Sequence, residues 1–189
     1  MSQLTRKLIV EKTLEMATKK PVGKITVREI VTECEITRNT FYYYFHDVYH
    51  VLDSALMDQI EDNRKFGDQF EDRMFDLMEK VTKYKKVWQN LYASMGREEM
   101  TKYVTNKLHA VLKDYIASVT ENHHVSAKDK DIVVAFYEEA LVGIFFRWIQ
   151  SYKGTDDNMD LLFVTERIRV LFEGQIELVI ENAERNPAE

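Results

Sequence analysis

Cysteine, proline and glycine are scarce in this chain of 189 residues, which contains one, two and six of them respectively. A single cysteine cannot form an intrachain disulfide, and such low usage is typical of a protein of the reducing cytosol. No stretch approaches the ~20 consecutive apolar residues that span a bilayer. No apolar run of signal-peptide length follows the N-terminus either. These absences predict a cytoplasmic protein that contacts no membrane.

The shortage of helix-breaking residues favours an all-α fold, and no alternating apolar and polar pattern predicts a strand. Apolar periodicity predicts long helices at 5–20, 47–66, 70–95, 98–122, 128–152 and 158–184. The third of these is expected to divide near Tyr84, and polar turns separate the later ones. Hydrophobic residues make up 45% of the chain, which is ample for a core.

Two short helices joined by a tight turn are predicted between the first two long ones. Thr26 and Glu29 have the spacing of a capping box, so the first short helix should begin at Val27. Its apolar residues then fall on one stripe of the helix. Glu35 and Ile36 form the break after this helix.

The second short helix leaves most of its side chains outside. Thr37 can cap it, and it buries mainly Phe41 and Phe45, four residues apart. The outward-facing residues are Arg38, Asn39, Thr40, Tyr42, Tyr43 and Tyr44. Arginine can form two hydrogen bonds with guanine and asparagine two with adenine, while hydroxyls suit phosphate oxygens. The pattern is therefore typical of a helix that enters the major groove of DNA.

At these residues the chain resembles the TetR family of bacterial transcription regulators. The resemblance is carried by the segments KITVREIVTEC and ITRNTFYYYF and by the amphipathic helix before them. The variant FYYYFHDVYHVL resembles more the branch that includes regulators of dihydroxyacetone kinase operons. The resemblance implies a helix-turn-helix DNA-binding domain at 1–50, here called the head, with the start of a linking helix at 47–66. A helical effector-binding and dimerisation domain is then expected at 51–189.

The resemblance also implies roles for individual residues of the head. The expected DNA-binding residues are Thr26, Arg28, Thr37, Arg38, Asn39, Thr40, Tyr42, Tyr43 and His46. The head carries eight Lys and Arg against six Asp and Glu, whereas the remaining residues carry 18 against 26. A charge of +2 on the head beside −8 on the rest suits a protein whose head meets phosphate. Because +2 is weak, tight binding would need two heads.

Three positions of the head depart from the family pattern. Glu35 stands where the family usually has glycine, and a left-handed backbone there would cost roughly 1–2 kcal/mol. Tyr44 replaces a common histidine and could instead pack against the following helix. Val48 replaces a phosphate-binding lysine. The residues that could supply the positive charge of this missing lysine are His46, Lys24, Arg6 and Lys7.

Aromatic residues of the middle helices are expected to line a pocket for a small-molecule effector, because the family places one there. The expected ligand-binding residues are Phe70, Trp88, Tyr92, Tyr103 and Phe136. Such pockets are mostly apolar with a few polar groups. The alternative is that these side chains are plain core, as aromatic stripes at helical spacing usually are.

The last two long helices are the expected interface of a homodimer. The segment 131–150 is apolar nearly all round, which predicts burial on more than one side. The expected interface residues are Phe145, Trp148, Ile168, Phe172 and Ile176. Symmetric pairing would set two recognition helices about 34–36 Å apart on a palindromic operator in double-stranded DNA. The alternative is that these helices form an intrachain core.

Enzyme motifs are missing from the sequence. There is no glycine-rich phosphate loop and no nucleophile elbow. His46 and His50 are four residues apart on a predicted helix, but no third ligand is evident, so neither a metal site nor a cofactor is expected. We predict a sequence-specific transcriptional regulator, a repressor that a small-molecule effector releases or modulates. The alternative is a helical dimeric regulator that acts through a protein partner and binds no DNA.

Overall fold

The computed structural model describes residues 3–61, 78–79, 81–151, 159–171 and 174–186. Helices and the turns between them make up these residues, which include no strand. The predicted all-α fold is therefore confirmed. The chain divides into two compact units, the first from Met1 to Arg97 and the second from Glu98 to Glu189.

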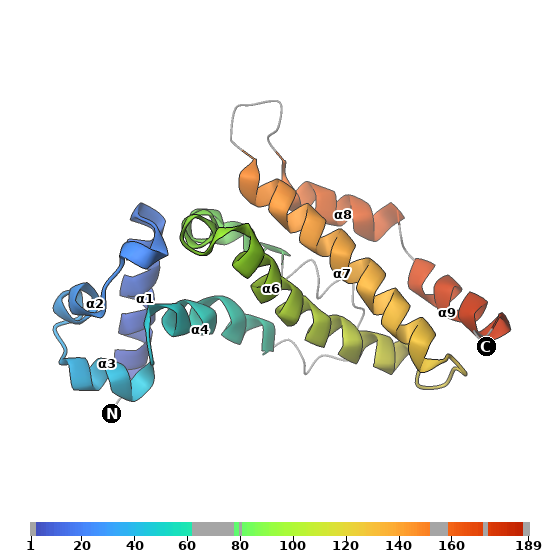
Figure 1. Ribbon diagram of the computed structural model, residues 1–189, viewed down its shortest axis with the longest axis horizontal. Coiled ribbons are helices and arrows are strands. Elements are labelled where there is room, and N and C mark those ends of the chain that lie inside the picture. Colours follow the sequence, from blue (N-terminus) through green and yellow to red (C-terminus); the bar gives the residue numbers. More distant parts are fainter. Residues whose placement is uncertain (1–2, 62–77, 80, 152–158, 172–173, 187–189) are drawn as a thin grey trace. The chain divides into compact units, whose positions relative to one another are not determined.

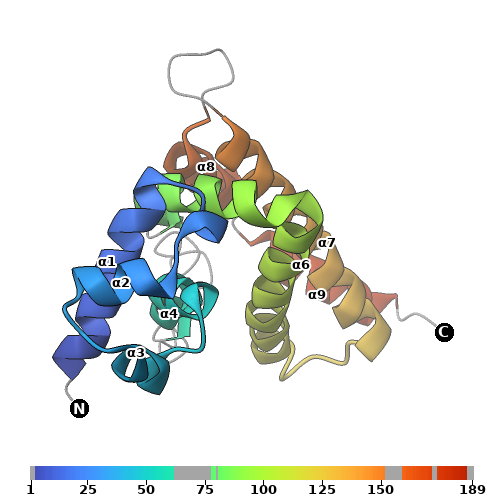
Figure 2. The ribbon, with the colours of Figure 1, turned by 60° about the vertical axis from the view of Figure 1, so that its left-hand side comes forward.

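The first unit is built around one long N-terminal helix (Figure 1). Its elements are α1 (Gln3–Lys19), the 3-10 helix η1 (Val22–Lys24), α2 (Val27–Glu33), α3 (Arg38–Tyr44) and α4 (Val48–Glu61). α1 contacts both α2 and α4, and α2 contacts α3. α2 lies beside α1 in Figure 1 and again in the turned view of Figure 2. The fully buried side chains of the first unit include Ile9, Ile30, Phe41, Phe45, Val51 and Leu52.

The single cysteine belongs to this core. Cys34 is buried, and its thiol lies 3.9 Å from the backbone oxygen of Leu8 on α1. Removal of the thiol from water raises the pKa of Cys34, because the charged thiolate loses more solvation than the neutral thiol. Its role here is that of a small buried apolar residue.

Helix α6 (Lys85–Val119) is interrupted at Gly96, whose φ of 78° and ψ of 175° are not helical. The predicted breaks near Tyr84 and at Gly96 are both confirmed. The first unit ends one residue after Gly96, so the stretch 85–95 belongs with the head rather than with the second unit. The boundary expected after residue 50 thus differs from the division into compact units, because α4 also packs on α1.

The second unit contains the rest of α6, α7 (Ala127–Gln150), α8 (Leu161–Leu171) and α9 (Gln175–Arg185). Figure 1 shows α6 and α7 running side by side, and His109 on α6 lies 2.9 Å from the buried carboxylate of Glu138 on α7. Glu184 near the end of α9 accepts bonds from the His123 ring (2.9 Å) and the His124 backbone N–H (3.1 Å). These two bonds, the His123 ring first, lower the pKa of Glu184.

The prediction of one helix over 158–184 was wrong. The described part of that range contains two helices, which Gly174 separates with a left-handed φ of 73°. Glycine adopts this conformation without the steric cost that any other residue bears. A lone glycine in an otherwise helical pattern is often tolerated inside a helix, so the pattern alone did not reveal the break.

The single chain does not cover helix 131–150 all round, and the burial on more than one side that was expected in a dimer stays a prediction. Ile132 and Phe136 on α7 are exposed, Phe136 to 67%. The buried residues of α7 are Val134, Glu138, Val142, Phe145, Phe146, Trp148 and Ile149. Apolar periodicity indicates which side chains could be covered, but it does not say that anything covers them.

None of the described helices is both long enough and apolar enough to cross a membrane.

Candidate nucleic-acid interface

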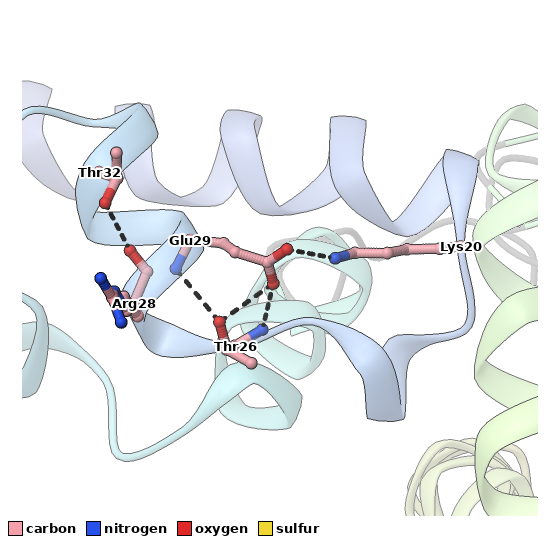
Figure 3. A network of polar contacts seen from close by, with 5 residues as sticks. All are labelled: Lys20, Thr26, Arg28, Glu29 and Thr32. Atoms are coloured by element: carbon pink, nitrogen blue, oxygen red, sulfur yellow. Dashed lines mark hydrogen bonds and ion pairs between the residues drawn. The ribbon is translucent and has the colours of Figure 1, made fainter.

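The start of α2 is a closed hydrogen-bonded ring (Figure 3). The backbone N–H of Glu29 donates to the Thr26 hydroxyl oxygen at 3.2 Å, and the backbone N–H of Thr26 donates to Glu29 Oε2 at 2.9 Å. The predicted capping box is therefore confirmed. The Thr26 hydroxyl also donates its proton to Glu29 Oε2 at 3.0 Å. That proton must leave Glu29 before Thr26 can donate to a phosphate, so the DNA contact of Thr26 stays a prediction.

Lys20 completes this network from the end of the first helix. Its ammonium lies 2.6 Å from Glu29 Oε1. The Lys20 hydrogen bond, followed by the two bonds from Thr26, lowers the pKa of Glu29 to about 2. Glu29 therefore stays ionised and joins the segment after α1 to the first turn of α2. Arg28 is exposed beside it and extends away from the Lys20–Glu29 pair (Figure 3).

The turn between α2 and α3 is a Schellman motif built on a glutamate. Glu35 has a left-handed φ of 52°, so the conformation that glycine would favour is kept although the residue is a glutamate. The N–H of Ile36 donates to the Val31 carbonyl (3.0 Å) and that of Glu35 to the Thr32 carbonyl (3.2 Å), which are the two bonds of this motif. The turn therefore keeps the geometry of a glycine turn at an energetic cost.

The recognition helix α3 is buried on one side and exposed to solvent on the other. Thr37 caps it by accepting the N–H of Thr40 at 3.1 Å, as predicted. Phe41 and Phe45 are fully buried, and their rings lie 6.2 Å apart. The exposed predicted contacts are Thr37, Arg38, Asn39, Tyr42 (54%), Tyr43 (64%) and His46, while Thr40 is half-buried. The structure thus gathers these residues on one short helix and its two ends.

Tyr44 is covered more than Tyr42 and Tyr43, so the prediction that it points outward was only half right. It is half-buried, with its ring 4.9 Å from the Tyr43 ring in an edge-to-face contact. Val48, at the position of the family's phosphate-binding lysine, is buried as the first residue of α4. A lysine here would have to carry its charge out of the core, whereas valine packs within it.

Arg6, one of the residues proposed to supply charge to DNA, is used inside the first unit instead. Its guanidinium lies over the Phe45 ring, 5.4 Å from the centroid, and donates to the Ser54 hydroxyl on α4. A signal in the sequence could have shown this, since Arg6 falls on the buried stripe of Ile9 and Thr13. Arg6 thereby supports the anchor of α3 from α1. Lys7 and Lys24, by contrast, are exposed.

His46 and His50 stack at the start of α4, with ring centroids 4.9 Å apart. The backbone N–H of His46 donates to His50 Nδ1 at 3.1 Å, and Asp47 accepts the N–H of His50 at 2.8 Å. His50 therefore helps to fix the turn after α3. Among the residues that the structure describes, no group of three or more His, Cys, Asp or Glu side chains could hold a metal ion.

The predicted effector residues are spread along the chain. Trp88 is buried and Tyr92 half-buried in the first unit, while Tyr103 is half-buried in the second. Phe136, also in the second unit, is mostly exposed, and Phe70 lies outside the described residues. Their shared role in a pocket stays a prediction.

The predicted dimer residues lie mostly inside the chain. Phe145, Trp148 and Ile176 are buried in the single chain, so they have little area left to give to a second copy. Ile168 is half-buried, and Phe172 lies outside the described residues. The apolar residues that α8 and α9 do expose are Phe163, Val170, Leu171, Leu178 and Val179.

Comparison with known proteins agrees with this geometry. Residues 9–48 match a family model described as "Bacterial regulatory proteins, tetR family", and residues 68–159 match one described as "Transcriptional regulator C-terminal region". A solved structure, "Dihydroxyacetone kinase operon activator DhaS", is similar with a TM-score of 0.72. The match covers 94% of this chain and 98% of that chain at 17% identity, which shows a shared fold. A search of curated proteins found no match.

A helix-turn-helix with an exposed recognition helix, followed by a helical C-terminal region, defines a DNA-binding transcriptional regulator and not an enzyme. The chain belongs to the TetR family of bacterial transcription regulators.

Replacing Glu35 with glycine should stabilise the head. Relief of the left-handed strain gains roughly 1–2 kcal/mol, and the greater freedom of glycine in the unfolded chain takes back roughly 0.5–1 kcal/mol. We expect a net gain of about 0.5–1 kcal/mol in the free energy of unfolding, measured by urea denaturation. The control, Glu33→Gly at the last residue of α2, should instead lose about 1 kcal/mol. Equal losses in both variants would contradict the assignment of strain to Glu35.

Replacing Glu29 with glutamine should flatten the acid dependence of stability. The pKa of Glu29 is about 2 in the folded protein, below its ordinary value of 4.5. Its ionised contacts therefore stabilise the fold above pH 4.5 and are lost as the pH falls towards 2. Urea midpoints measured across this range should fall more steeply for wild type than for Glu29→Gln. The exposed Glu33→Gln should keep the wild-type slope, and parallel curves for all three would refute the role of the network.

Proposed function

We propose that this protein is a homodimeric repressor that binds a palindromic operator and is released from it by a small-molecule effector. The observation that carries the proposal is the separation of roles on α3. Phe41 and Phe45 hold the helix, while Arg38, Asn39 and Tyr43 are left in solvent. Arg38 and Asn39 are then suited to base edges in the major groove, and the tyrosine hydroxyls to phosphate.

The charge of the head supports binding by two copies. The head has a net charge of only +2, and two of its cations are engaged within the first unit, Arg6 with Ser54 and Lys20 with Glu29. Non-specific attraction to phosphate scales with the number of cations that reach it. A single head is therefore a weak ligand for DNA, and pairing two heads on one operator multiplies their affinities.

The exposed apolar side chains of α8 and α9 support a symmetric dimer. Phe163, Val170 and Leu171 lie at spacings of seven and one on α8, which puts them on one side of that helix. Leu178 and Val179 add an exposed apolar pair on α9. Contiguous exposed apolar surface is typical of an interface. We therefore replace the buried Phe145, Trp148 and Ile176 with these residues as the main contacts between two copies.

The effector proposal is supported by the aromatic residues of the middle of the chain. Trp88 and Tyr92, which both belong to the first unit, offer apolar rings with polar atoms, which are the side chains that small-molecule pockets use. A compound bound there can act only if it binds two conformations with different affinity. The readout is release of operator DNA on addition of the compound.

An activator role is the alternative that the comparison favours, because the similar solved structure is named an operon activator. A repressor and an activator bind DNA alike and have opposite effects on transcription. Transcription from the cognate promoter, measured with and without the protein, separates them. A partner-dependent regulator without DNA binding is the further alternative, supported by the buried Val48 and the engaged hydroxyl of Thr26.

Replacing Arg38 with alanine should weaken binding to the chain's own upstream DNA by about 1–3 kcal/mol in each head, because a bidentate base contact is lost. Tyr42→Phe, which removes one hydroxyl, should weaken binding less. Fluorescence anisotropy over a salt series measures both, and affinity should fall steeply as salt rises. Lys113→Ala, an exposed cation of the second unit, is the matched control and should bind like wild type. Wild-type affinity in Arg38→Ala would contradict the proposal that α3 reads the DNA sequence.

Replacing Leu171 or Leu178 with glutamate should break the dimer. Each leucine is exposed in the single chain, so the charge is tolerated by the monomer but costly in a dry interface. Sedimentation velocity should show wild type at twice the chain mass of 22.4 kDa and the variants at that mass. Phe136→Glu on α7 is the control at an equally exposed apolar position and should remain dimeric. If only Phe136→Glu dissociates, the interface lies on α7 instead.

A further inference from the structure

The turn that joins α1 to α2 contains backbone groups that its own residues cannot satisfy. In a continuing helix the carbonyl of Ala17 would accept from the N–H four residues later. That residue is Pro21, which has no N–H. At η1, the N–H of Gly23 is an orphan of the first turn, and Pro21 as N-cap offers no side-chain acceptor.

Two side chains from the distant stretch 85–95 supply both missing partners. The Asn90 amide donates to the Ala17 carbonyl at 2.8 Å, and the Ser94 hydroxyl oxygen accepts the Gly23 N–H at 3.0 Å. The Ser94 hydroxyl in turn donates its proton to the backbone carbonyl oxygen of Asn90 at 2.8 Å. Asn90 and Ser94 are four residues apart, so they lie on the same face of the helix.

A third segment reaches the same place. A Cβ atom on Gly23 would lie 3.6 Å from Ser94 Cβ and 3.6 Å from the hydroxyl oxygen of Tyr49 on α4. The turn after α1, the start of α4 and the stretch 85–95 therefore meet around Gly23. All three belong to the first unit. After Ser94 the chain passes the break at Gly96 and enters the second unit.

We propose that Asn90 and Ser94 are positioning residues that set the orientation of the DNA-reading head on the stretch 85–95, the part of the chain that leads into the second unit. They contact no DNA themselves. They complete the turn whose next residues, from Lys24 to Thr26, lead into the capping box of α2. This inference rests on the proposed function, since orientation has a consequence only when two heads must fit two half-sites at once.

Hydrogen exchange tests the bonds without any DNA. In Ser94→Ala the amide of Gly23 should exchange about five- to tenfold faster, because its N–H loses the hydrogen bond to Ser94. Asn90→Ala should speed exchange over residues 20–24, because the turn loses its other tie. Ser118→Ala and Asn106→Ala, matched changes at exposed positions of α6 in the second unit, should leave this region unchanged. Unchanged protection in both test variants would overturn the inference.

Operator spacing tests the consequence. Footprinting of wild type on its upstream DNA defines two half-sites, and affinities are then compared for that operator, for one lengthened by a base pair, and for one half-site alone. Wild type should prefer the native spacing at least about tenfold, because only correctly placed heads bind together. Asn90→Ala and Ser94→Ala should reduce this preference to below about threefold while binding the half-site as wild type does.

The outcomes separate the two proposals. Equal weakening on all three DNAs means that the variants only destabilise the head, and it would overturn the positioning role. Wild-type spacing preference in both variants would overturn it as well. Failure of wild type itself to bind its upstream DNA would instead refute the proposed function, whatever the variants do. Ser94→Ala removes a single oxygen, so it serves as the folded test if Asn90→Ala unfolds.

Discussion

Everything that the head offers to DNA depends on the burial of Phe41 and Phe45. Helix α3 has seven residues, far fewer than the ~12–15 that an isolated helix needs to persist in water. Each buried ring contributes about 1.5–3 kcal/mol, and the guanidinium of Arg6 covers one of them. Because the buried Phe41 and Phe45 hold the helix in place, the exposed residues on its other side can vary without loss of the fold.

The features that the sequence predicted best are those decided by neighbouring residues. The capping box at Thr26, the cap at Thr37 and the turn at Glu35 each depend on a few positions, and all three are present. The spacing places Arg6 on the buried stripe of α1, but its partner Ser54, like the contact of Asn90 with Ala17, could not be predicted in the same way. Arg6 contacts a residue 48 positions away, and Asn90 contacts one 73 positions away. No local sequence pattern indicates contacts between residues so far apart.

Apolar residues show a different limit of prediction. Their spacing on 131–150 and 158–184 indicated helices that need cover, but not which face the chain itself covers. Trp148 was predicted at a surface between copies and is buried in one copy, whereas Phe136 was predicted in a pocket and is exposed. Periodicity indicates on which face of its helix a side chain lies. Whether another helix, a second copy or solvent covers that face depends on the packing of the whole chain.

The reactivity of the single cysteine, Cys34, can report local opening of the head. Cys34 is buried in the core of the head, and its raised pKa leaves little thiolate, the form that reacts with alkylating or disulfide reagents. A native molecule is therefore almost inert, and modification has to wait until α2 moves away from α1. The rate at which one thiol is labelled then reports how often the DNA-reading part opens, independently of the second unit.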